Sequence, residues 1–132
     1  KLAKGEVLQV AWNGPAPKPA WNWWDPKGNE LVTQWRSTPS MVDLNADGLM
    51  DLVTLDTEGY LAFYERRRKA DGSLELLPPQ RAFWGEGVSE YNSAGQPAGV
   101  GKDKSGVLRM NAGVAGRSGR RTFCFVDWDG DG

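Results

Sequence analysis

Residues 41–66, MVDLNADGLMDLVTLDTEGYLAFYER, decide the fold, because they join an acid-rich loop to two runs of strand-forming residues. Within residues 43–51, oxygen-bearing side chains stand at alternate positions around Gly48, and glycine adopts a positive φ at little cost. Oxygens of this kind are the ligands of Ca²⁺, which takes roughly six to eight of them. We therefore expect a metal loop whose ligands are the side chains of Asp43, Asn45, Asp47 and Asp51 and the backbone carbonyl of Leu49.

The same loop has two competing interpretations. An EF-hand needs a bidentate Glu at the twelfth position of its loop, and that position holds Thr54. Residues 51–55 are also rich in strand formers, whereas the second half of an EF-hand is a helix. The other alternative is an acid-rich turn without metal. Carboxylates this close together repel one another unless a cation lies among them, so we favour the metal loop.

The loop resembles the calcium loop of FG-GAP and VCBS repeats, because D-L-N-A-D-G-L-M-D-L-V at residues 43–53 follows the family pattern D-x-N-x-D-G-x-x-D-L-V. Repeats of this family form the blades of β-propellers. The resemblance implies an all-β fold of FG-GAP/VCBS propeller blades, with antiparallel hairpins and long loops. It further implies that residues 1–132 are a single segment of an incomplete propeller, that the cofactor is Ca²⁺, and that the location is extracellular, periplasmic or on the cell surface.

Strand-forming runs follow the loop. Residues 49–55 and 60–64 predict a hairpin joined by the turn at residues 56–59, which ends in glycine as such turns often do. A third strand is expected at residues 74–77, where two prolines then stop it. Further strands are expected at residues 6–12, 30–36, 80–84 and 107–111.

The end of the sequence repeats the beginning of the loop. Residues 125–132, FVDWDGDG, place acids in the register of the oxygen-bearing side chains of residues 42–48. A pattern repeated in fixed register is typical of repeat architectures. We therefore expect one complete repeat with its calcium loop at residues 43–51 and the start of a second at residues 127–132. Missing blades or another chain would cover the open sheet edges. The further metal ligands expected are Asp127, Asp129 and Asp131.

The composition excludes several classes of function. Lys and Arg number 16 and Asp and Glu 17, so no net charge favours nucleic acid as a partner. No apolar run reaches the roughly 20 residues of a membrane-spanning helix. The absence of His excludes a Ser-His-Asp triad and a His-ligated zinc site within this chain. The lone Cys124 lies in the apolar run at residues 123–126, where we expect a small buried side chain.

The resemblance leads to three hypotheses for function. The first is a calcium-binding propeller segment of a secreted bacterial protein that binds or processes polysaccharide. The second is part of a propeller-fold polysaccharide lyase, although this chain shows no catalytic constellation. The third is an adhesion or protein-interaction module. The residues considered for a lyase are Tyr91, Arg117, Arg120 and Arg121.

Two further patterns bear on a polysaccharide partner. Trp21, Trp23 and Trp24 offer flat faces on which sugar rings stack, but Trp also packs into cores because it buries a large area. The basic run at residues 65–69 has the charge to hold an anionic polysaccharide. Charged runs of this kind also protect exposed strand edges from aggregation, which is the interpretation we favour for this one.

Overall fold

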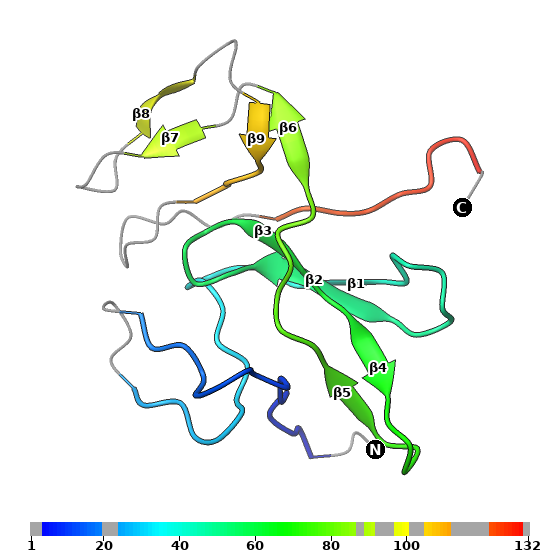
Figure 1. Ribbon diagram of the computed structural model, residues 1–132. Helices are drawn as coiled ribbons and strands as arrows, with labels where there is room; N and C mark the ends of the chain where they lie inside the picture. Colours follow the sequence, from blue (N-terminus) through cyan, green and yellow to red (C-terminus); the bar gives the residue numbers. More distant parts are fainter. Residues whose placement is uncertain are drawn as a thin grey trace.

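The chain is all-β in the parts that the structure describes. In these parts there is no helix, and the strands form four small antiparallel sheets, none of them closed (Figure 1). The all-β part of the prediction is therefore confirmed. The computed structural model describes residues 4–19, 24–86, 89–91, 97–100, 105–111 and 122–130. The strands are β1 (Ser40–Val42), β2 (Asp51–Leu55), β3 (Leu61–Tyr64), β4 (Arg66–Arg68), β5 (Leu74–Leu76), β6 (Trp84–Glu86), β7 (Ser89–Tyr91), β8 (Pro97–Val100) and β9 (Ser105–Val107).

The largest sheet has three strands in the order β1-β2-β3, all antiparallel. Every residue of β2 and β3 is buried. The expected hairpin is confirmed, with Leu55 paired to Leu61 across the 56–59 turn. β1 precedes the acid-rich loop and was not expected from the sequence, because residues 40–42 are too few to show an alternating pattern.

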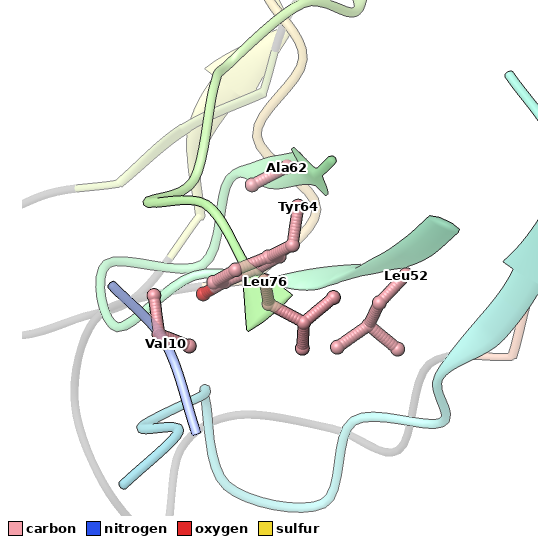
Figure 2. Close-up of a cluster of buried hydrophobic side chains, with 5 residues drawn as sticks. All are labelled: Val10, Leu52, Ala62, Tyr64 and Leu76. Atoms are coloured by element: carbon pink, nitrogen blue, oxygen red, sulfur yellow. The ribbon is translucent and has the colours of Figure 1, made fainter. Parts of the chain in front are cut away.

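The central sheet is covered on both faces. Successive side chains of a strand point to opposite sides, so Leu52 and Tyr64 lie on one face while Val53 and Phe63 lie on the other. This explains why β2 is apolar at consecutive positions. One face packs as a cluster of Val10, Leu52, Ala62, Tyr64 and Leu76 (Figure 2). The other packs as Val53, Leu55, Leu61 and Phe63, against Val42, Phe83, Leu108, Met110, Phe123 and Phe125.

Segments distant in sequence provide these two covers. On the first face, the Val10 amide donates to Asn29 (2.8 Å) and the Ala11 amide donates to Leu76 (2.7 Å). The second face is covered by side chains from residues 83, 108–110 and 123–125. At the edge of β3 away from β2, Phe63 and Gln80 exchange two backbone hydrogen bonds of 2.9 and 2.8 Å, which hold the segment before Phe83 in place. In Figure 1 the N-terminal part and the C-terminal part accordingly lie on opposite sides of the central sheet.

The remaining pairs of strands are short. β4 and β5 form a hairpin, β6 pairs with β9, and β7 pairs with β8. The basic run contributes β4, where Arg67 forms an ion pair of 2.6 Å with Glu75 on β5. This exposed, paired position agrees with the strand-edge interpretation. The described residues include no helix long and apolar enough to cross a membrane.

Some sequence expectations are wrong in detail. Residues 6–12 and 30–36 form no strand. They meet through the isolated pair of Gln9 with Glu30 and through hydrogen bonds such as that from the Leu31 amide to the Leu8 carbonyl. A positive φ of 58° at Arg36 turns the chain, which interrupts any extended run there.

The expected strands at residues 80–84 and 107–111 each form only in part. Gln80 pairs with β3 before β6 begins at Trp84. In the other run, Val107 is the last residue of β9, and Arg109 makes an isolated pair with Tyr60. In both runs the chain changes pairing partner midway, and an alternating pattern does not indicate such a change.

Cys124 is exposed, which corrects the expectation of a buried thiol. Its neighbours Phe123 and Phe125 pack against the core cluster of the central sheet. Side chains in an extended segment alternate in direction, so the residue between them points away from the core. The apolar character of the run misled the prediction, because only every second residue in it is needed for packing.

Candidate metal centre

The 43–51 loop joins β1 to β2 and closes the hairpin between them. Val42 and Asp51 are paired residues of the two antiparallel strands, so the loop connects neighbouring strands directly. Asp51 is both the last residue of the loop and the first residue of β2. The conformation of this loop is therefore directly coupled to the start of β2, a strand that is buried along its whole length.

Backbone amides curl the loop around the carboxylates of Asp43 and Asp47. Asp43 accepts at Oδ1 from the Asp47 amide (3.1 Å) and at Oδ2 from the Gly48 amide (2.9 Å). Asp47 Oδ1 accepts in turn from the Leu49 amide (2.8 Å). Ala46 and Gly48 have φ values of 59° and 83°. This left-handed conformation costs a residue with a Cβ roughly 1–2 kcal/mol, so the loop holds Ala46 in an unfavourable geometry.

Asp51 connects the loop to the rest of the fold. Its side chain is fully buried, with 0% exposure. Oδ2 accepts a hydrogen bond from the Leu44 amide (3.0 Å), and Oδ1 accepts one from the Arg66 amide (2.7 Å). A buried carboxylate is stable only when such donors compensate its loss of hydration. One side chain thus links the beginning of the loop, the beginning of β2 and the beginning of β4.

The structure brings together three of the predicted ligands. The Asp47 amide donates to Asn45 Oδ1 (3.2 Å) as well as to Asp43, and Asn45 Nδ2 donates to Asp47 Oδ2 (3.3 Å). Leu49 follows in the same loop and is half-buried. Among the described residues, however, no three acidic, His or Cys side chains form a group that could hold a metal ion.

The loop therefore has the oxygen donors and the curved backbone that a calcium ion requires. Its carboxylates, however, do not point toward one common centre. The oxygens of Asp43, Asp47 and Asp51 face backbone amides in place of a shared centre. A carboxylate oxygen has a second lone pair after accepting one hydrogen bond. To coordinate one ion, the carboxylates of the loop would have to rotate toward a common centre.

The second acid-rich segment is described as far as residue 130. Asp127 Oδ1 accepts a hydrogen bond from the Gly130 amide (2.7 Å), and Gly130 has a φ of 78°. Gly130 is the fourth residue of this segment, the position that Ala46 holds in the first loop, and both have a positive φ. Asp129 is exposed and lies between the two bonded residues. Asp131 lies outside the described residues.

Several other candidates also fall outside what the structure describes. Trp21 and Trp23 are among the residues not described, whereas Trp24 is 38% exposed. Tyr91 belongs to β7, but its side chain is not described. The lyase hypothesis therefore gains no geometric support from this structure. The remaining lyase candidates, Arg117, Arg120 and Arg121, also lie outside the described residues.

A second polar cluster lies at the 56–59 turn, where the sequence had indicated only a hairpin. Asp56 Oδ1 accepts from the amides of Glu58 (2.9 Å) and Tyr60 (3.0 Å), and Asp56 Oδ2 accepts from Arg81 Nε (2.6 Å). Arg81 also forms an ion pair with Glu58, and its guanidinium carbon is 3.9 Å from the centre of the Tyr60 ring. An Asp three residues before Gly59 was the available signal, since Asp commonly bonds the backbone amides of turns.

Comparisons with known proteins do not add a family. No family model, no curated protein and no solved structure matches the chain. The assignment to FG-GAP/VCBS repeats therefore stays a prediction that rests on the motifs at residues 43–53 and 125–132. The geometry of the described residues is the remaining basis for inferring a function.

Proposed function

We propose that the 43–51 loop binds Ca²⁺ and that the ion stabilises an all-β segment of FG-GAP/VCBS propeller type. The bound ion supplies positive charge that relieves repulsion among the loop's carboxylates. Its binding energy adds to the stability of the folded state, because the unfolded chain holds no preformed site. The residues that would hold it are Asp43, Asn45, Asp47 and Asp51 through their side chains and Leu49 through its backbone carbonyl.

The observation that carries this proposal is the position of Asp51. Its buried carboxylate already bonds the amides of Leu44 and Arg66, so the loop's last ligand is part of the core framework. Order gained in the loop is therefore transmitted to two strands at once. A structural ion, in contrast to a catalytic one, needs no open coordination position and no substrate cleft beside it, and the loop's role in closing a hairpin agrees with that.

The wider role that we propose is polysaccharide binding or processing outside the cytoplasm, as part of a longer propeller that begins a second repeat at Asp127. Large aromatic side chains that project into solvent support this role, because their faces suit the apolar faces of sugar rings. Trp84 is 71% and Trp128 92% exposed. The remaining strongly exposed indoles among the described residues are Trp24 and Trp35.

Thermal unfolding with and without calcium tests the metal proposal. The protein is freed of divalent ions with a chelator and then melted with CaCl₂, with MgCl₂, and without added metal. At a calcium concentration of about 100 times Kd, binding adds about 2.7 kcal/mol and raises Tm by roughly 10 °C for a chain of this size. Calorimetric titration gives the stoichiometry. A melting temperature unchanged by calcium, together with no heat of binding, would falsify the proposal.

A matched pair of variants separates the ion from the turn. Asp47 and Asp71 each accept a bond from the amide two residues ahead, Leu49 at 2.8 Å and Ser73 at 2.9 Å. Asp47→Ala and Asp71→Ala therefore remove the same kind of turn bond. We expect both to lower Tm slightly in chelator, but only Asp47→Ala to abolish the calcium-dependent increase. Equal calcium responses in the two variants would contradict the assignment of ligands.

A further inference from the structure

A cavity of about 450 Å³ lies next to the 56–59 turn, away from the acid-rich loop. Its walls come from five parts of the chain: the N-terminal segment, the segment before β1, the turn after β2, strand β3 and the segment that follows β5. The volume lies within the range of small-ligand sites, which are mostly apolar with a few polar groups. Its lining residues are Trp12, Pro17, Val32, Asp56, Thr57, Tyr64, Pro79 and Arg81.

The Tyr64 hydroxyl in this wall is buried without a hydrogen-bond partner among the described residues. The side chain is 0% exposed, and its Oη forms no hydrogen bond with any of the described residues. Figure 2 shows the ring lying across the core cluster, with the oxygen at the end nearest Val10. Proteins rarely leave a buried hydroxyl unsatisfied, because such a group loses hydration without compensation. A ligand that offers a hydrogen-bonding group at this point would remove that deficit.

The hydroxyl is protonated at neutral pH and can therefore donate. Burial, followed by the negative charge of Asp56, raises the pKa of the Tyr64 phenol well above its usual value. Tyr64 shares the lining of the cavity with Asp56 and Arg81, which are paired with each other.

The charges around the cavity compensate each other. Asp56 is paired with Arg81, and Arg81 is also paired with Glu58. Arg109 Nε donates to the Glu58 carbonyl and its guanidinium lies 5.0 Å from the Tyr60 ring, so a second cation is close by. Among the described residues, the two charged side chains of the lining, Asp56 and Arg81, balance each other, as do the nearby Glu58 and Arg109, so they give the site no excess charge to attract an ion. The ligand that fits is therefore neutral.

We propose that this cavity binds a neutral sugar ring, with an apolar face of the ring against Trp12. A ring hydroxyl then bonds Tyr64 Oη, after the side chains that cover this oxygen shift to admit it. Trp12 is suited to this role because its Nε1 donates to the Glu30 carbonyl (3.2 Å), which fixes the indole in the wall. Pro17, Val32 and Pro79 provide further apolar surface. The ion pair of Asp56 and Arg81 supplies an acceptor and a donor for a second hydroxyl. The choice of a sugar rests in part on the proposed glycan role, whereas the site itself does not depend on calcium.

The test uses D-glucose, D-mannose and D-galactose as neutral probes and D-glucuronate as their charged counterpart. Binding to the full chain is measured by saturation-transfer NMR and calorimetry, first with calcium and then with chelator. We expect at least one neutral hexose to bind in both conditions and glucuronate to bind more weakly. If no hexose binds the wild-type chain, or if only glucuronate binds, the inference is overturned.

Two conservative variants locate the site. Tyr64→Phe removes only the unpartnered hydroxyl, so the free protein should melt at the wild-type temperature or higher while hexose affinity falls about three- to tenfold. Tyr60→Phe removes a hydroxyl from a tyrosine that does not line the cavity and should leave affinity unchanged. Equal affinity of Tyr64→Phe and wild type overturns this site. If hexose binding is weakened by Tyr64→Phe and is unchanged by chelator, the sugar site is supported. This holds even if calcium has no effect on the melting temperature.

Discussion

Gly59→Ala should be among the most damaging single substitutions in the described part of the chain. Gly59 has a φ of 85°, and a Cβ built on it would lie 2.1 Å from the backbone oxygen of Asn111. Its own carbonyl accepts hydrogen bonds from the amides of Met110 (2.9 Å) and Asn111 (3.2 Å). The clash is with backbone, so no side-chain rotation relieves it. The 56–59 turn and the segment at residues 110–111 would have to separate.

The magnitude comes from three contributions. The left-handed conformation costs alanine roughly 1–2 kcal/mol. Overpacking against an immobile neighbour adds about 1–3 kcal/mol. Weakening the two bonds to the Gly59 carbonyl adds about 1 kcal/mol. We therefore expect the free energy of unfolding to fall by about 3–6 kcal/mol.

Gly72→Ala is the matched control. Gly72 has a φ of 82°, but a Cβ there meets no atom within 4 Å, so this variant pays only the conformational cost of about 1–2 kcal/mol. Both variants are unfolded in urea and followed by tryptophan fluorescence. With a slope of about 2 kcal/mol per molar urea, the midpoint should fall by roughly 1.5–3 M for Gly59→Ala and 0.5–1 M for Gly72→Ala. Equal midpoints in the two variants would show that residues 59 and 111 are not in contact.

Three further predictions concern single side chains. Asp51→Asn should lower the free energy of unfolding in chelator by about 2–3 kcal/mol. The reason is that the amide nitrogen of asparagine cannot accept the hydrogen bond that one carboxylate oxygen of Asp51 accepts. An unchanged urea midpoint would contradict the geometry described. Cys124 should react with a thiol reagent in the native protein at the rate of an unfolded control, since it is exposed, and labelling limited by the rate of unfolding would show it to be buried. Because burial raises the pKa of Tyr64, the unfolded state loses this proton first, so stability should fall as the pH rises above about 10. Tyr64→Phe should reduce that fall, and an identical pH profile for the variant would refute the shift.

The central hairpin could be predicted from the sequence because its signals are local. Residues 51–55 and 61–64 are apolar at most positions and include the strand formers Val53, Thr54, Phe63 and Tyr64, and the glycine-ended turn between them fixes their register. The acid-rich loop was equally visible, since its spacing and its glycine are properties of consecutive residues. Both features depend on contacts within a stretch of about 25 residues. The spacing of residue types along that stretch is enough to predict them.

The remainder depends on contacts between distant segments, which no local pattern shows. Gln9 and Val10 look like part of a strand, yet their pairs are Glu30 and Leu76 from separate parts of the chain. The cavity beside Tyr64 could not be predicted for the same reason, because its walls come from five segments. Whether a carboxylate faces a metal or a backbone amide is likewise set by side-chain rotation, and the spacing of Asp43 and its neighbours does not determine it.

The way the central sheet is covered sets how the chain folds. The hairpin of β2 and β3 can close early because its contacts are local, but Val10 must find Leu76 and Tyr60 must find Arg109 before either core cluster is sealed. Closing such long stretches costs entropy before any contact repays it, so folding should be slow for a chain of this size. Until then, apolar side chains on both faces of the hairpin are exposed to water. The chain is therefore most prone to self-association after the hairpin has formed and before the outer segments pack against it.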